Sequence, residues 1–235
     1  MIRVVVLCAL LLAATAPAEP DKRWNIRVEL QVVALPDALA VPLVAELMDE
    51  KKIDPAYARI QELLANGTAK LIGWPIVTTH SGERATAEAT REIRYASEYN
   101  PPTVSFTPSV STTEILKIEP KADVTLFEAT PSRFDSRNTG VYLEVEPTVS
   151  PDGKTIAVNV VPQHVRLVGF EKITIEKPET GGKVVVEQPQ FDTMKVTTQL
   201  TLRNGQRVLM GVYRVSEPPN HLEFFILKAE AKKVE

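Results

Sequence analysis

The sequence predicts an α+β protein that is rich in β-structure, built from antiparallel hairpins with two short helices near the N-terminus. Three observations support this fold class. Two helical stretches with capping signals lie between residues 37 and 67. After residue 67, apolar and polar residues alternate over many short runs, which is the period of a strand. Asp-Gly and Asn-Gly pairs separate several of these runs, as they do in hairpin turns.

Composition excludes several classes of protein. The 235 residues are 44% apolar with a net charge of -3, so the chain can bury a sizeable core and differs from disordered sequences. No cluster of Lys and Arg stands out, which disfavours a nucleic-acid binder. The single Cys excludes an internal disulfide and a zinc site built on cysteines. Eighteen Pro against ten Gly predict short, frequently interrupted elements.

Residues 1–18 are predicted to form a secretory signal peptide. Arg3 supplies a basic start, residues 4–14 are apolar, and Ala16 and Ala18 fit the small-x-small cleavage rule. The alternative is a buried N-terminal strand or helix. The apolar run is too short for a permanent membrane helix, which needs about 20 residues. Cleavage after Ala18 would remove Cys8, so the mature chain would have no Cys.

The first strand and the first helix follow this segment. Apolar and polar residues alternate at the start of residues 26–35, which predicts a strand ended by Pro36. Asp37 is expected to cap a helix that runs to about residue 49. Pro42 predicts a kink in this helix or a late start.

A second helix and a hairpin come next. Asp54 is expected as N-cap with Pro55 at the first helical position, and Asn66-Gly67 as the left-handed stop. Residues 68–79, interrupted at Trp74-Pro75, are expected to pair with residues 84–99 through a turn at 80–83. Residues 100–122 contain four Pro and are expected to form a long loop or a loosely formed hairpin.

The second half of the chain predicts further strands and hairpins. In the closing strand, Phe224-Phe225 puts one ring on each face, which suits a strand covered on both sides. The expected elements are a strand at 123–129, a hairpin 140–149/154–161 with Asp152-Gly153 at its turn, a hairpin 165–175/183–187 turning at 179–182, a hairpin 193–202/207–213 turning at Asn204-Gly205, and a closing strand at 221–229.

Catalytic motifs are missing from the sequence. His80, His164 and His221 are far apart and are expected on turns or strand surfaces. Glu144 and Glu146 share one strand face, which is typical of a solvated surface. No GxSxG, P-loop or GxGxxG occurs. We therefore expect no enzyme activity, no cofactor and no metal, and assign no catalytic, cofactor-binding or metal-binding residue.

Ordered motifs carry a family resemblance. The run Thr139-Gly140-Val141-Tyr142-Leu143-Glu144-Val145-Glu146-Pro147-Thr148-Val149 is followed by Asp152-Gly153. Before it come residues 28–33, 63–75 and 78–85, and after it residues 197–211 and 221–227. In this order the segments resemble the C-terminal core of secretins, the outer-membrane channel proteins of type II and type III secretion and type IV pilus systems.

The resemblance implies a secretin-like core over residues 26–229 and a polar tail at 230–235, without the repeated N-terminal ring domains. Ala34 departs from the Glu usual in the opening strand, Val212 from the Gly after Gly211, and Lys228 from the usual Thr-Pro. The implied residues of the family's structural motif are Gly140, Leu143, Val145, Pro147, Asp152, Gly153, Gly205 and Gly211.

The resemblance also implies a function. Secretin cores assemble as rings in which strands of neighbouring subunits join. We therefore expect a structural component of an outer-membrane secretion or pilus-type assembly, in the periplasm or outer membrane. Its partners would be further copies of itself or other secretion components, and no nucleic acid. The alternatives are a monomeric periplasmic scaffold or binding module that reuses the fold, and an unrecognised hydrolase.

The signal for lipid-facing strands is poor. Residues 165–177 place Glu171 within an apolar face, where a charge at mid-depth is unfavourable. Their partner, residues 183–187, is short and is expected to end at Pro189.

Overall fold

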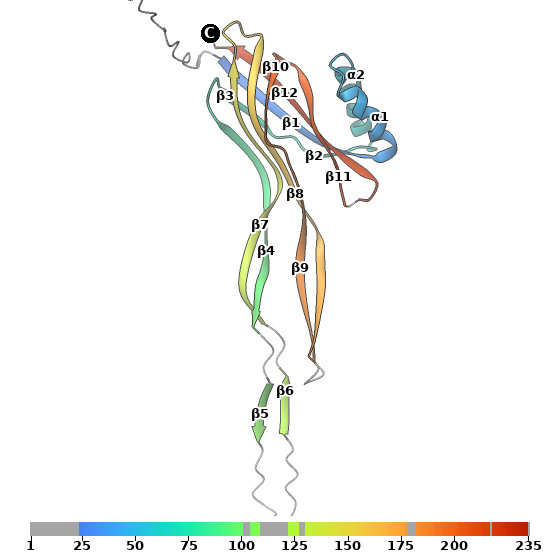
Figure 1. Ribbon diagram of the computed structural model, residues 1–235, viewed down its shortest axis with the longest axis vertical. Helices are drawn as coiled ribbons and strands as arrows, with labels where there is room; N and C mark the ends of the chain where they lie inside the picture. The colour runs from blue at the N-terminus through green and yellow to red at the C-terminus, as the bar shows by residue number, and fades with distance from the viewer. Residues whose placement is uncertain are drawn as a thin grey trace, which may run out of the picture.

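Two packed sheets form the body of the protein, and two long hairpins project from it (Figure 1). The computed structural model describes residues 24–100, 104–108, 122–126, 130–177, 182–216 and 218–234. Within these ranges the chain forms two helices and twelve strands. The strand ladders are all antiparallel, and this arrangement and the two helices confirm the predicted fold class. The predicted signal peptide lies outside the described residues.

The first sheet, called here the helix-covered sheet, joins the two ends of the described chain. Its strand order is β11-β12-β1-β2, and β3 pairs with β1 beside β2. The predicted strands at 26–35 and 221–229 are confirmed; both are longer, and β12 continues through residues 230–233. The interruption at Trp74-Pro75 is also confirmed. The strands are β1 (Trp24–Pro36), β2 (Lys70–Gly73), β3 (Ile76–His80), β11 (Arg207–Arg214) and β12 (His221–Lys233).

The two predicted helices are confirmed, with different starts. They are α1 (Asp37–Leu47) and α2 (Ile53–Ala65). Asp37 does not cap α1: Pro36 holds that position, and the Asp37 carboxylate binds Arg214 at 2.6 Å. Asp54 lies one residue inside α2, whose N-cap is Lys52. Gly67, with φ +77°, follows the end of α2 as expected.

The two helices pack on one face of this sheet and exclude water from the part of that face that they cover. Side chains of alternate residues on β1 and β12 point toward the helices, because successive side chains in a strand face opposite sides. This cluster is fully apolar and buried, and consists of Val33, Leu35, Ala40, Leu43, Leu47, Ile53, Ala56, Ile60, Ala69, Leu222, Phe224 and Ile226.

The second sheet, called here the hairpin sheet, carries the two projecting hairpins. Its order is β10-β8-β7-β4, with β9 also paired to β8. The predicted hairpins 140–149/154–161 and 165–175/183–187 are confirmed as parts of longer strands. The strands are β4 (Ala85–Asn100), β7 (Thr130–Val149), β8 (Thr155–Lys177), β9 (Gly182–Lys195) and β10 (Thr198–Arg203).

The main core lies between the two sheets. Phe225 is fully buried there, whereas its neighbour Phe224 is fully buried under the helices. The prediction of a closing strand covered on both faces is therefore confirmed. The inter-sheet core includes Ile26, Val28, Leu30, Val32, Val141, Leu143, Val145, Ile156, Val158, Val160, Met194, Leu202, Phe225, Leu227 and Ala229.

Two predicted hairpins are wrong. Residues 68–79 and 84–99 do not pair: β3 pairs with β1, whereas β4 pairs with β7 in the other sheet. Likewise β10 pairs with β8, whereas β11 pairs with β12. The turns at 80–83 and Asn204-Gly205 reverse the chain but carry it from one sheet to the other. Turn chemistry specifies a reversal, and packing of the apolar faces selects the sheet.

Pro189 does not end β9, contrary to the sequence prediction. β9 runs on to Lys195, and Pro189 lies opposite Phe170 of β8. The described part of β9 pairs with β8 alone, so it is an edge strand, where the missing N–H of Pro is tolerated. In the Pro-rich region, β5 (Val104–Pro108) pairs with β6 (Ala122–Leu126), and the intervening residues 109–121 lie outside the described residues.

Candidate functional site

Most residues of the implied family motif lie in the core or at turns, where they have structural roles. Leu143 and Val145 point into the inter-sheet core and are at most 1% exposed. The carbonyl of Pro147 accepts a 2.7 Å hydrogen bond from the N–H of Gly82, at the turn between the sheets. The N–H of Gly205 donates to the carbonyl of Ala229 at 2.9 Å, at the other crossing between the sheets.

Two of these glycines lie where a side chain would not fit. Gly140 has φ +124°, and a Cβ there would lie 2.1 Å from the carbonyl oxygen of Ala89. Gly153 has φ +72°, and its Cβ would lie 2.3 Å from the ring of Trp24. Both positions therefore need glycine for conformation and for space. In the same turn, hydrogen bonds from Ser150 and Lys154 lower the pKa of Asp152.

A buried polar cluster, which the sequence analysis missed, joins the two sheets. His164 of β8 and Glu223 of β12 have side chains 6% and 0% exposed, and His164 Nδ1 lies 2.8 Å from Glu223 Oε2. Arg166 Nη1 lies 3.6 Å from Glu223 Oε1, and its Nη2 donates to Asp192 Oδ2 at 2.7 Å. The hydroxyl of Ser216 donates to Asp192 Oδ1 at 3.0 Å.

Hydrogen bonds in this cluster favour the charged form of Asp192. Burial raises the pKa of Asp192, but hydrogen bonds from Arg166 and Ser216 outweigh that effect and hold the pKa below its ordinary value. Glu223 lies between two nitrogen-bearing side chains, His164 and Arg166, and these neighbours offset part of the cost of burying its carboxyl group. The cluster can therefore hold β8 against β12.

The prediction that every His lies on a turn or strand surface is wrong for His164. Strand period could have placed it, because His164 shares the parity of the buried residues Val158 and Val160 on β8. Glu223 likewise shares the parity of Phe225 and Leu227 on β12. In both strands, the two-residue alternation of buried positions continues beyond the apolar residues to a polar residue, and this continuation is the signal that could have placed His164 and Glu223.

The remaining predicted polar residues are more exposed. His80 ends β3 on the surface, and His221 Nδ1 lies 3.0 Å from the carbonyl oxygen of Pro219. Glu144 and Glu146 both bind Arg84, at 3.1 and 3.5 Å. A cavity of about 510 Å³ lies beside the buried cluster and is lined by Lys70, His164, Arg166, His221 and Glu223, among others. Among the described residues that line this cavity, no hydrogen bond joins a nucleophilic side chain to a base. Within the described ranges, no three His, Cys, Asp or Glu are grouped to hold a metal.

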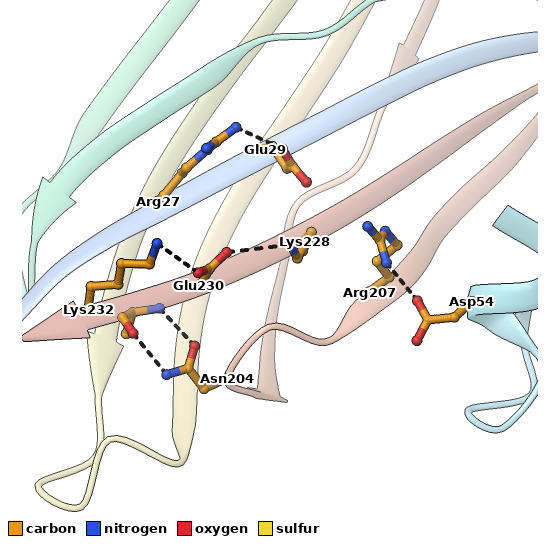
Figure 2. A network of polar contacts seen from close by, with 9 residues as sticks. Arg27, Glu29, Asp54, Asn204, Arg207, Lys228, Glu230 and Lys232 are labelled. Atoms are coloured by element: carbon orange, nitrogen blue, oxygen red, sulfur yellow. Dashed lines mark hydrogen bonds and ion pairs between the residues drawn. The ribbon is translucent and has the colours of Figure 1, made fainter. Parts of the chain in front are cut away.

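The outer face of the helix-covered sheet is charged beyond the helices (Figure 2). Arg27 binds Glu29 on β1, and Glu230 binds both Lys228 and Lys232 on β12. The adjacent turn is fixed by Asn204, whose side chain makes two hydrogen bonds to the backbone of Ala231 (Figure 2). This half of the sheet is therefore built to face water.

Open strand edges are the most extensive candidate for a functional surface. Among described residues, β11 pairs only with β12, and β2 and β3 pair only with β1. In the described part of the hairpin sheet, β4 pairs only with β7, and β10 only with β8. Short turns join β3 to β4 and β10 to β11, so the two sheets are connected at both of these edges. The body thus has two open sides, the β3–β4 side and the β10–β11 side, each with edges from both sheets.

Exposed apolar residues accompany one of these sides. Leu71, Trp74 and Ile76 lie on or between the edge strands β2 and β3, and each is 43–45% exposed. Exposed edges with large apolar side chains are a template for pairing with another chain. Neither described helix has the length and hydropathy needed to cross a membrane.

Comparison with solved structures returned secretins at low identity. The type II secretin GspD of enteropathogenic Escherichia coli is 10% identical, with a TM-score of 0.38 over 91% of this chain and 70% of that one. The type III injectisome secretin InvG of Salmonella is 10% identical, with a TM-score of 0.37 over 90% and 63%. The type IV competence pilus secretin PilQ of V. cholerae is 12% identical, with a TM-score of 0.35 over 89% and 58%.

A family model gives the assignment. No curated protein sequence matched the chain. The model described as Secretin, bacterial type II and III secretion system protein, matches residues 63–216, about two thirds of the chain. The matched region runs from the end of α2 through β11 and includes all the implied motif residues. The chain therefore belongs to the secretin family of bacterial type II and III secretion system proteins.

Proposed function

We propose that this protein is a non-enzymatic structural component of a secretion or pilus-type assembly, and that it acts by forming a ring of identical copies. The observation that carries the proposal is the pair of open sides, each with strand edges from both sheets. In a ring, the β3–β4 side of one copy would meet the β10–β11 side of the next. Such a head-to-tail contact closes into a ring if the rotation between copies allows it.

Strand directions support this contact. Neighbouring strands alternate in direction across both sheets, because every ladder in each sheet is antiparallel. Each path from one edge to the other contains four strands, β11-β12-β1-β3 in one sheet and β10-β8-β7-β4 in the other. The two edge strands of each sheet, β3 and β11 or β4 and β10, therefore run in opposite directions. Both new pairs would be antiparallel, and the alternation would continue from copy to copy. The exposed side chains of Leu71, Trp74 and Ile76 would lie close to the first of these seams.

We also propose that the protein is exported and works in the periplasm or at the outer membrane, with residues 1–18 as its removable signal and residues 26–229 as its core. The apolar run and the small-x-small site before Glu19 support this. The N-terminal residue of the exported protein tests it. Glu19 or a close neighbour is expected, and an intact Met1 would contradict it.

Disulfide cross-linking tests the seam. In a Cys8→Ser background, Thr86→Cys on β4 is combined with Gln199→Cys or with Thr201→Cys on β10; all three positions are exposed. Oxidation of at least one pair should give a ladder of trimers and larger species on a denaturing gel, because each copy contributes both halves of the seam.

Controls separate this result from random collisions. Thr86→Cys alone can give only dimers, and Thr86→Cys with Ala45→Cys places the second thiol on the exposed surface of α1. If both seam pairs give no species beyond those of the controls, the head-to-tail ring is wrong. A purified monomer would instead favour a periplasmic scaffold that reuses the fold.

A further inference from the structure

The two projecting hairpins separate from each other at a defined point. β7 and β8 pair from Val149↔Ile156 to Gly140↔Val165. Beyond that pair, β7 continues with β4 to Thr130↔Asn100, and β8 continues with β9 to Lys177↔Gly182. The distal halves are thus two separate two-stranded hairpins, which Figure 1 shows side by side. A two-stranded hairpin has little stability alone, so contacts between the two control their separation.

Four side chains connect the hairpins just beyond the separation point. Nη2 of Arg137 on β7 donates a 2.7 Å hydrogen bond to Oγ1 of Thr193 on β9. The guanidinium carbon of Arg137 lies 4.8 Å from the ring centroid of Phe191 on β9. The ring of Tyr95 on β4 lies 6.0 Å from the same ring, centroid to centroid, at 52°. These residues, two from each hairpin, are named here the hairpin clamp.

The clamp is chemically suited to open and close. Arg137 and Thr193 are exposed, so water can replace their hydrogen bond when the hairpins separate. Cation–π contacts at exposed sites are individually weak. The buried polar cluster around Glu223, by contrast, lies within the body and does not link the hairpins to each other.

Two local irregularities of the backbone mark the separation point as the place where the hairpins can pivot. Gly140 has φ +124° and contacts the β4 backbone closely, and β8 has a register shift between Leu167 and Gly169. A β-bulge bends a strand and increases its twist locally. Each hairpin thus has one backbone irregularity near the point where it leaves the body, and the clamp joins the hairpins beside these positions.

We propose that Tyr95, Arg137, Phe191 and Thr193 form a releasable clamp that sets the distance between the two projecting hairpins. Releasing Arg137 lets the hairpins move apart as intact two-stranded units that pivot near Gly140. The proposal concerns a single chain and does not depend on ring formation.

Distance measurements between spin labels test the clamp. In a Cys8→Ser background, labels are placed at Ser132→Cys on β7 and Thr174→Cys on β8, both exposed and outside the clamp. Labelled chain is mixed with excess unlabelled chain, so that only distances within one chain contribute. For the chain with an intact clamp, pulsed electron–electron double resonance should show one narrow distribution of distances between the two labels. Arg137→Ala should add a longer-distance population, with about a tenfold shift in the open-to-closed ratio.

A matched control lies within one hairpin. The guanidinium carbon of Arg94 lies 4.9 Å from the ring centroid of Phe134, and both residues belong to the β4–β7 hairpin. Arg94→Ala removes the same kind of contact and should leave the distance distribution unchanged. Thr193→Val, which removes one hydrogen bond, should shift the ratio in the same direction as Arg137→Ala but less. If Arg137→Ala does not fold, the Thr193→Val variant alone tests the clamp. Unchanged distributions in folded Arg137→Ala or in Thr193→Val would overturn the clamp.

Discussion

At the scale of single residues, the pair His164 and Glu223 shows how a polar contact is held inside a β-sandwich. Glu223 is fully buried, and His164 and Arg166 approach its two carboxylate oxygens from the opposite sheet. A buried carboxylate without such partners is strongly unfavourable. The hairpin sheet thus supplies the nitrogen-bearing side chains and the helix-covered sheet supplies the carboxyl group. This contact helps to specify the position of β8 relative to β12.

Removing His164 should therefore be costly. His164→Ala leaves Glu223 buried without its closest partner, and we expect a loss of about 3–5 kcal/mol in the free energy of unfolding, measured by urea titration. Glu187→Gln is the control, because the Lys172–Glu187 pair is more than half exposed and contributes about 0–1 kcal/mol. Equal losses in the two variants would show that the buried pair has no special role.

The charge on Asp192 predicts a dependence on pH. The folded chain holds the pKa of Asp192 below its ordinary value. Its charge therefore stabilises the fold above the unfolded pKa of about 3.9, and that contribution disappears as the pH falls through the folded pKa. Urea titrations at a series of pH values, from neutral pH down into the acid range, should show a smaller acid loss for Asp192→Asn than for the natural chain. Parallel profiles would contradict this role.

Sequence patterns predict apolar residues better than polar ones at this scale. Alternation placed Phe224 and Phe225 on opposite covered faces, because apolar side chains are themselves the signal. His164 and Glu223 follow the same alternation, but a polar residue at a core position becomes predictable only when its partner is known. That partner lies 59 residues away along the chain. The clamp residues were missed for the same reason.

At the scale of elements, turn residues predict where the chain reverses but not where the next strand pairs. The turns at Ser81-Gly82 and Asn204-Gly205 both carry the chain between the sheets. Asp152-Gly153, with similar chemistry, joins two strands of one sheet. The difference lies in the long-range fit of β3 to β1 and of β11 to β12, which no short window of sequence contains.

Gly140 lies at the last pair of the β7–β8 ladder, and a substitution there tests whether the position requires glycine. Gly140→Ala places a Cβ against the carbonyl of Ala89 at a positive φ, and should destabilise the fold by about 3 kcal/mol or more. Gly205→Ala is the control, since Gly205 also has positive φ but nothing lies within 4 Å of its Cβ. It should cost only about 1 kcal/mol, again by urea titration. A Gly140→Ala cost no larger than the control would contradict the steric argument.

At the scale of the whole molecule, the two open sides connect the fold to its proposed assembly. Each side offers one edge from each sheet, so a single contact between copies would extend both sheets together. The charged outer face formed by Arg27, Glu29, Lys228 and Glu230 is compatible with a body that stays in water (Figure 2). The β4–β7 and β8–β9 hairpins project from that body, and the paired strands β5 and β6 lie beyond the distal end of β4 and β7 (Figure 1).

The most direct test of ring assembly is the particle mass of the purified protein, measured by mass photometry in plain buffer and in detergent. We expect a discrete multi-subunit particle in at least one of these conditions, because strand pairing at both edges is satisfied only when the ring is closed. Ring-shaped averages in electron micrographs should accompany that mass. A stable monomer of the mature chain in both conditions would show that the protein does not assemble into a ring.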